Sequence, residues 1–180
     1  MHSRRIVVAL AVALAGCSGG GESPASPSTP GGSTPGGSTL DVTDAAVSSL
    51  ARAPSGWTYY KNRGDTLLRS SGSGHSEARL RTRYNALAAA QLDASGRVRA
   101  GAVFPDSALI VKELIISGTL NRYAVMMKLR GSSNASSGGW LWAYYAPDGT
   151  TQIGITGKGA ACTACHATGI DFTRMNDSHP

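Results

Sequence analysis

The chain has 180 residues, of which 41% are hydrophobic and 16% are charged, and its formal net charge is +6. This length suits one domain of ordinary size. The positive charge is mild and spread out, without a run of five or six basic residues, so we expect no nucleic-acid partner.

Residues 1–17 have the parts of an export signal. Two arginines precede an apolar run from residue 6 to 14, and the tetrapeptide Leu-Ala-Gly-Cys that ends at Cys17 resembles the lipobox of bacterial lipoproteins. The run is too short to span a bilayer. We therefore expect a signal peptide at 1–16 and lipidation of Cys17, with export to the periplasmic side and anchoring in a bacterial membrane, the outer one by preference. The alternative is ordinary secretion with Cys17 unmodified.

Residues 18–40 consist almost entirely of Ser, Gly, Pro and Thr and repeat the sequence STPGG. Such a segment cannot bury enough apolar area to order itself. The span from 17 to 40 is therefore predicted to be a lipidated cysteine followed by a disordered linker, with a reach of roughly 25–30 Å.

Residues 41–180 are long enough for one domain, and two helices are predicted in its first half. The segment 41–53 begins with acids beside a threonine and ends before Pro54, which is typical of a helix. A second helix is predicted over 83–92, ending near Ser95-Gly96.

Beyond Val98 the sequence changes character. The segments 107–117, 122–130 and 139–146 are rich in β-branched or aromatic residues, and Gly, Ser and Asn lie between them. Three such segments at hairpin distances indicate an antiparallel sheet. The predicted class is α+β, mainly β: an antiparallel sheet or sandwich with short helices and a C-terminal helix that carries the motif described next.

Cys162-Thr163-Ala164-Cys165-His166 forms a C-x-x-C-H sequence near the end of the chain. Two cysteines at this spacing can add to the two vinyl groups of one haem, and the histidine after them can reach the iron. A zinc site would need a fourth ligand, and a thioredoxin-like dithiol would need a βαβ context. We therefore predict one covalent haem c per chain, held by Cys162, Cys165 and His166, with zinc binding or a redox dithiol as alternatives.

Several short sequence motifs occur in an order that resembles the cytochrome P-460 and cytochrome c′-beta family. They are Gly56-Trp57, Gly74-His75, Tyr84-Asn85 with Ala88, Phe104-Pro105-Asp106, Val111-Lys112-Glu113, Met127-Lys128, Trp140-Leu141-Trp142, CTACH and Asp171-Phe172-Thr173. Each motif except CTACH is weak evidence for the family when taken alone. The resemblance implies an antiparallel β fold, a homodimer, a five-coordinate haem with one open face, and reactions with hydroxylamine or nitric oxide.

Lys112 lies in an otherwise apolar row of the strand at 107–117. Such a lysine either extends its ammonium group outward, pairs with a carboxylate or has a chemical task. In cytochromes P-460 a lysine makes an additional covalent bond to the porphyrin, and the resemblance makes Lys112 the matching residue. Lys128 shares its row with two arginines, so we expect it to face solvent.

Glu113 also has apolar residues for neighbours on its own side of the strand, and a buried carboxylate needs a hydrogen bond or an ion pair. It is a possible proton acceptor near the iron. The alternative is an ion pair with Arg79, Arg81 or Arg83. Between Lys112 and Cys162 the only other acid is Asp148, which lies in a predicted turn.

Other residues have more ordinary interpretations. Ile110, Phe104 and Met127 are predicted to line the pocket. Met126 and Met127 are predicted to pack in the core, and the alternative for either is the sixth position on the iron. His75 either hydrogen-bonds a haem propionate or caps a turn.

Three functions remain open at this point. The protein is an oxidoreductase that acts on hydroxylamine or nitric oxide, a binding protein for such gases without turnover, or a simple electron carrier. Expected partners are a small nitrogenous ligand, a redox partner such as a small cytochrome, the membrane through the lipid anchor, and a second copy of the chain.

Overall fold

The computed structural model describes residues 41–179. The predicted signal peptide, Cys17 and the predicted linker lie outside the described residues. Within residues 41–179, no helix has the length and apolar character that crossing a membrane requires.

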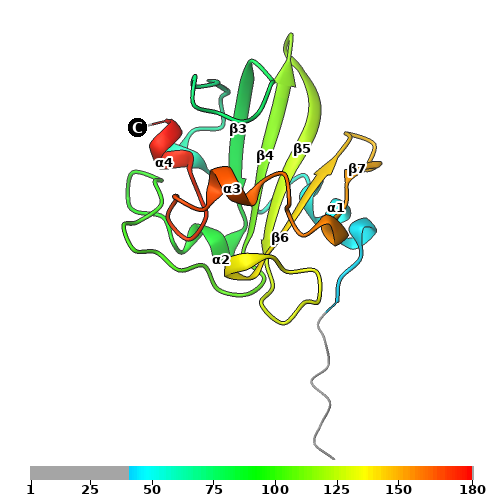
Figure 1. Ribbon diagram of the computed structural model, residues 1–180. Coiled ribbons are helices and arrows are strands. Elements are labelled where there is room, and N and C mark those ends of the chain that lie inside the picture. The colour runs from blue at the N-terminus through cyan, green and yellow to red at the C-terminus, as the bar shows by residue number, and fades with distance from the viewer. Residues whose placement is uncertain (1–40, 180) are drawn as a thin grey trace, which may run out of the picture. The chain divides into compact units, whose positions relative to one another are not determined.

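One antiparallel sheet of seven strands forms the centre of this part of the chain (Figure 1). The strand order is β1-β3-β4-β5-β6-β7, and β2 pairs with β3 beside β1. The strands are β1 Thr58–Tyr59, β2 Leu67–Leu68, β3 Arg79–Tyr84, β4 Leu109–Ile116, β5 Thr119–Lys128, β6 Trp140–Tyr145 and β7 Thr151–Ile153. The helices are α1 Asp44–Ala51, α2 Ala86–Ala89, α3 Thr163–His166 and α4 Met175–Ser178, with 3₁₀ turns η1 Tyr60–Asn62, η2 Ser137–Gly139 and η3 Ile155–Gly157.

A tight turn sets the register of the two longest strands. Ser117 and Gly118 join β4 to β5, and both have positive φ, 50° and 81°. Two central residues of this kind form the hairpin turn whose twist matches that of the flanking strands. The pairing that follows places Lys112 opposite Ala124 and Ile110 opposite Met126.

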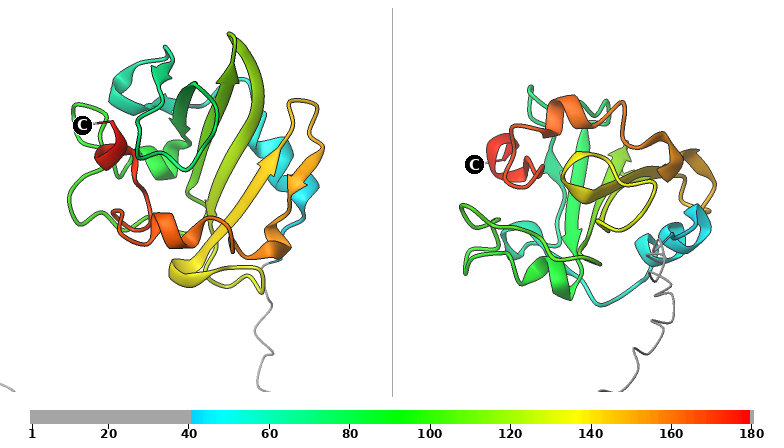
Figure 2. Two further views of the ribbon diagram at one scale, coloured as in Figure 1. Left: turned by 45° about the horizontal axis from the view of Figure 1, so that its top comes forward. Right: turned by 60° about the horizontal axis from the view of Figure 1, so that its bottom comes forward.

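Alternation along the paired strands gives the sheet two faces with separate cores. The front face, which α3 crosses in Figure 1, carries Thr82, Tyr84, Ile110, Lys112, Ala124, Met126, Lys128, Trp140, Trp142 and Tyr144. The back face carries Arg81, Arg83, Val111, Glu113, Val125, Leu141, Ala143 and Tyr145, and α1 packs on it through Val47 and Ala51. In Figure 2, α3 and α4 lie close to each other and away from α1.

The sequence predictions of the class, the first helix and the three main strands are confirmed. Thr43 caps α1 by accepting a hydrogen bond from the Ala46 amide at 3.2 Å. The second predicted helix is wrong in its first part, because Arg83 and Tyr84 pair with Val111 and Ile110 in the sheet. Strand β3 was not predicted from the sequence, because three of its six residues are arginines and it lacks a β-branched or aromatic run. The strict alternation Arg-Leu-Arg-Thr-Arg-Tyr is the signal that identifies it as a strand.

Candidate haem site

A cavity lies on the front face of the sheet, between the strands and the last part of the chain. Its lining comes from β3 to β6, from residues 72–75, from residues 161–166, which include α3, and from residues 173–178. It contains about 960 Å³ of empty space, part of which is open to solvent.

Cys162, Cys165 and His166 all line this cavity. Helix α3 begins directly after Cys162 and includes the other two residues, so the two thiols lie about one helical turn apart. Both cysteines are free thiols; Cys162 is half-buried and Cys165 is exposed. Burial, with a smaller effect of Cys165, raises the pKa of the Cys162 thiol. The structure thus brings the three predicted haem-attachment residues together at one wall of the cavity.

The backbone fixes the protonation state of the His166 ring. His166 Nδ1 lies 2.7 Å from the carbonyl oxygen of Phe172, and a carbonyl can only accept, so Nδ1 carries the proton and donates it. Burial lowers the pKa of His166 to about 4, although the bond to Phe172 acts in the opposite direction. The imidazole is therefore neutral at pH 7 with a lone pair on Nε2, which is the form that binds a metal. The Trp142 ring packs edge-on against it at 4.8 Å between centroids.

Lys112 also lines the cavity. Burial, followed by the positive charge of Arg174, lowers the pKa of its ammonium group to about 8. None of the ion pairs found within residues 41–179 includes Lys112. A substantial fraction of its amine is therefore neutral near pH 8, which is the nucleophilic form.

Glu113 lies on the opposite face from Lys112, as neighbouring residues of a strand do. One of its oxygens accepts a hydrogen bond from Arg81 Nε at 2.6 Å, and the other lies 3.4 Å from Arg83 Nε. Its side chain is 6% exposed and is absent from the cavity lining. The predicted role as proton acceptor is therefore wrong, because the sheet separates this carboxylate from the cavity; the alternative, an ion pair with arginine, is the one that forms.

Lys128 does not face solvent, in contrast to the sequence prediction. It is 1% exposed, and its ammonium group lies 2.7 Å from an oxygen of Asp171. The prediction failed because the row of Lys112 and the row of Lys128 lie on the same face of the sheet, which follows from the pairing of Lys112 with Ala124. Strand register between two segments cannot be read from either segment alone.

Of the three residues expected in the apolar lining, Ile110 lines the cavity, whereas Phe104 and Met127 do not. Met126, which was expected to pack in the core, also lines the cavity. Met127 lies on the back face opposite Leu109 and Leu141, and Phe104 packs against Trp140 at 5.5 Å between ring centroids.

A polar pair lies at the cavity and consists of His75, for which the sequence indicates a haem propionate contact or a turn cap, and Tyr144, for which the sequence analysis gave no role. The Tyr144 hydroxyl lies 2.8 Å from His75 Nδ1, and both residues are part of the lining. Burial, then the charge of Lys112, lowers the pKa of His75 to about 3, so the ring is neutral at pH 7. The alternation Trp140, Trp142, Tyr144 along β6 is the sequence signal that places Tyr144 beside the haem-attachment segment.

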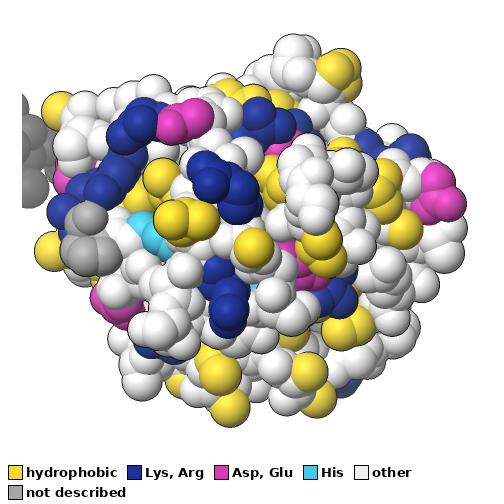
Figure 3. Space-filling view, turned by 90° about the horizontal axis from the view of Figure 1, so that it is seen from above, with side chains coloured by type: hydrophobic (Ala, Val, Ile, Leu, Met, Phe, Trp, Pro, Cys, Tyr) yellow, Lys and Arg dark blue, Asp and Glu magenta, His cyan; other side chains and the backbone are white. Residues whose placement is uncertain are grey.

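The lining is suited to a large aromatic cofactor. The Tyr84 hydroxyl is fully buried at the cavity and has no hydrogen-bond partner within residues 41–179, which is costly unless another molecule supplies one. No Asp or Glu is among the lining residues of the described chain. On the face shown in Figure 3, Lys and Arg side chains lie among apolar ones near a visible histidine. Free thiols, a neutral imidazole and basic residues form the donor set that fits a haem and its carboxylates.

The zinc alternative lacks a complete ligand set. No group of three or more His, Cys, Asp or Glu side chains within the described part of the chain is arranged to hold a metal ion directly.

Taken together, an antiparallel sheet and a C-x-x-C-H helix that closes a cavity on one of its faces define a haem-binding β protein. The cytochrome P460 family model matches residues 84–171, a range that includes Lys112, both cysteines of the motif and His166. This match identifies residues 84–171 as a cytochrome P460 domain, which indicates a haem-binding cytochrome. No curated protein matches the chain.

Proposed function

We propose that the protein carries one covalent haem c, attached through Cys162 and Cys165 and ligated by His166, and that it binds nitric oxide or a related small nitrogen species on the open side of the iron. The observation that carries this proposal is the neutral His166 imidazole beside two free thiols at a mainly apolar cavity. A bound haem supplies a coordination position at which such ligands bind and exchange electrons.

The cavity favours ligand binding over oxidation of hydroxylamine. Oxidation removes protons as well as electrons, so it needs a base beside the bound nitrogen. Within the described residues the lining offers no carboxylate. Apart from the proposed haem-attachment residues and Arg174, its titratable groups are the Tyr84 hydroxyl, the His75–Tyr144 pair and the Lys112 amine. We therefore propose reversible binding of nitric oxide as the main activity.

Lys112 supports oxidation of hydroxylamine or nitric oxide as the second candidate function. It reaches the cavity, has no carboxylate partner in the described chain, and has a lowered pKa. These properties suit the additional covalent bond to the porphyrin that the resemblance to cytochromes P-460 implies. This function would require an electron acceptor, for which a small cytochrome is the proposed partner.

We further propose the setting in which this chemistry takes place. The sequence up to Cys17 supports export to the periplasmic side and a lipid anchor, and the 23 residues after Cys17 support a flexible tether. A homodimer is proposed from the family resemblance. Incorporation of labelled palmitate into wild type but not into Cys17→Ser would test the anchor.

One preparation separates the candidate functions. The full chain is expressed with a haem-maturation system, reduced, and examined by absorption spectroscopy before and after addition of nitric oxide. We expect a high-spin spectrum that changes on addition and returns when the gas is removed. A low-spin spectrum that nitric oxide leaves unchanged would show two protein ligands and would support the electron carrier; Met126→Leu and His75→Gln would then identify the second ligand.

The bond to Lys112 has its own test. With this bond, the Soret band of the reduced protein lies far to the red of that of an ordinary c-type cytochrome, and Lys112→Ala returns it to the ordinary position. Lys158→Ala, at an exposed lysine, serves as the matched control. A red-shifted band that persists in Lys112→Ala would exclude this residue.

A further inference from the structure

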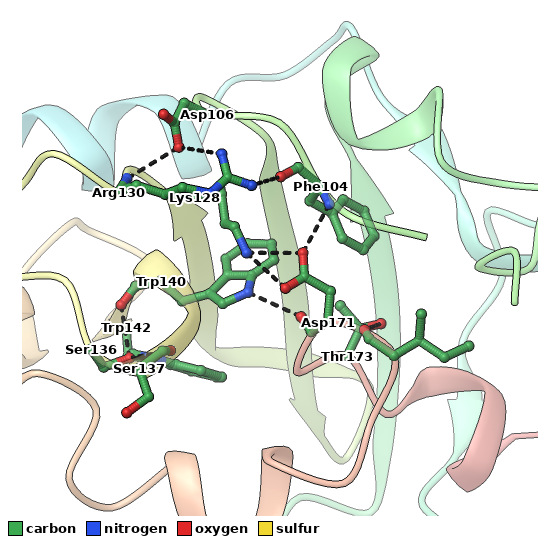
Figure 4. Close-up of polar contacts among 11 residues, drawn as sticks. Phe104, Asp106, Lys128, Arg130, Ser136, Ser137, Trp140, Trp142, Asp171 and Thr173 are labelled. Carbon is green, nitrogen blue, oxygen red and sulfur yellow. Dashed lines mark hydrogen bonds and ion pairs between the residues drawn. The ribbon is translucent and has the colours of Figure 1, made fainter. Parts of the chain in front are cut away.

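A buried ion pair lies beside the turn that contacts the haem-ligand histidine. Lys128 Nζ lies 2.7 and 2.9 Å from the two carboxylate oxygens of Asp171, and the two side chains are 2% and 12% exposed (Figure 4). The same ammonium group lies 4.7 Å from the centre of the Trp140 ring. The pair joins the end of β5 to the C-terminal segment, 43 residues further along the chain.

Asp171 is held by further hydrogen bonds on other sides. Its Oδ2 accepts a hydrogen bond from the Phe104 amide at 2.8 Å, and its carbonyl oxygen accepts one from Trp140 Nε1 at 3.0 Å. Figure 4 shows the carboxylate between the lysine and the Phe104 backbone. The position of Asp171 is thus determined by contacts to three separate parts of the chain.

The backbone at this point has an unusual conformation. Asp171 and Phe172 have φ of 42° and 67°, so two consecutive residues with side chains lie in the left-handed region, where such residues are disfavoured. The Phe172 ring packs closely over Gly138, where a side chain would collide with it. The strained turn exposes the Phe172 carbonyl to His166 Nδ1 at 2.7 Å.

We propose that Lys128 and Asp171 are positioning residues for the iron ligand. Their ion pair holds the strained turn in the conformation that aims the Phe172 carbonyl at His166 Nδ1. This hydrogen bond fixes the tautomer of the ring and increases the donor strength of Nε2 toward the metal. The inference rests on the proposed ligation of iron by His166.

A purely structural role explains the arrangement less well. A buried ion pair often contributes little net stability, because desolvation of both charges offsets their attraction. Strained backbone that the surrounding contacts maintain is typical of functional sites. Here every contact of Asp171 described above restrains the residue next to the carbonyl that His166 uses.

The test is made on the full-length holoprotein by resonance Raman spectroscopy of the ferrous state and by redox titration. Asp171→Asn keeps an acceptor oxygen for the Phe104 amide but loses the ion pair, and Lys128→Met/Asp171→Asn removes both charges. We expect the iron–histidine stretching frequency to fall and the reduction potential to rise in both variants. Trp140→Phe, which removes the bond to the Asp171 carbonyl and keeps the ion pair, should give a smaller shift in the same direction.

Two control variants separate positioning from stability. Asp106→Asn breaks the neighbouring exposed ion pair with Arg130, and Leu141→Ala weakens the core on the back face; neither should change the stretching frequency. If Asp171→Asn and the double variant bind haem and keep the iron–histidine stretching frequency and the reduction potential of wild type, the inference is wrong. If Asp171→Asn yields no holoprotein, Trp140→Phe decides by the same criterion. A wild-type protein without any iron–histidine band would instead contradict the proposed ligation.

Discussion

The two faces of one sheet differ in how completely their polar groups are matched. On the back face, Glu113 lies between Arg81 and Arg83, and the rest is apolar core against α1. On the front face, the Lys112 amine and the Tyr84 hydroxyl face the cavity without such partners in the described chain. Neighbouring residues of the same strands therefore have different roles: those on the back face stabilise the fold, and those on the front face line the cavity in which we propose that the haem binds.

The largest expected effect is on the front face. Cys162→Ser/Cys165→Ser removes both thiols that would form thioether bonds, so we expect complete loss of covalent haem. Mass spectrometry under denaturing conditions measures this directly, with Cys17→Ser as the control that keeps its haem. A haem mass that stays on the double variant would contradict attachment at this motif.

The back face should respond in stability alone. Leu141 is 1% exposed in the back core, and Leu141→Ala should lower the free energy of unfolding by about 2–5 kcal/mol because it leaves a cavity. Urea denaturation measures the loss, and the absorption spectrum of the folded protein should remain that of wild type. A changed spectrum would show that the two faces are coupled.

The sequence predicted this division only in part. The C-x-x-C-H spacing is local, so Cys162, Cys165 and His166 could be identified without the fold. Lys112 and Glu113 were placed in the right strand, but their separation by the sheet and the burial of Lys128 depend on the pairing of β3, β4 and β5. The Phe172 carbonyl is a backbone group presented by an unusual turn, and no side-chain pattern encodes it.

Glu113→Gln tests whether a charged residue of the back face affects stability alone. The variant leaves the Arg83 guanidinium, itself on a residue 5% exposed, without its counter-charge, and we expect a loss of about 1–3 kcal/mol in unfolding free energy. Affinity for nitric oxide should stay unchanged, because the side chain lies behind the sheet. A large loss of affinity with normal stability would restore the role of Glu113 as a proton acceptor.

The front face should also determine the response to acid. Burial and the nearby charge of Lys112 lower the pKa of His75 from 6.5 to about 3, so the unfolded chain binds a proton more readily than the folded one. Stability from this group is complete above pH 6.5 and is lost as the pH falls toward 3. The free energy of unfolding, measured by urea denaturation, should fall less between pH 7 and pH 4.5 for His75→Gln than for wild type. The expected difference is on the order of 1 kcal/mol after allowance for partial exposure.

Carboxylates such as Glu77 titrate in both proteins, so only the difference between wild type and His75→Gln is assigned to the histidine. Equal losses in the two proteins would show that His75 is readily protonated in the folded state.

The smallest effect is expected from adjacent tyrosines on opposite faces. Tyr144→Phe removes the hydroxyl that contacts His75, and we expect nitric oxide to dissociate about two to ten times faster, as the loss of one hydrogen bond implies. Tyr145→Phe removes a hydroxyl that donates to Asp44 on the back face at 2.8 Å and should leave the dissociation rate unchanged. Stopped-flow absorption measures both dissociation rates. Equal rates for the two variants would show that the His75–Tyr144 pair does not contact the bound ligand.

The proposed function depends most on a haem that is covalently attached at the front face and leaves one side of its iron open. The absorption spectrum of the purified, reduced full-length protein before and after nitric oxide tests this directly. We predict a coloured protein with a high-spin spectrum that changes reversibly with the gas. A colourless protein at the mass of the bare polypeptide, or a low-spin spectrum that the gas leaves unaltered, would contradict it.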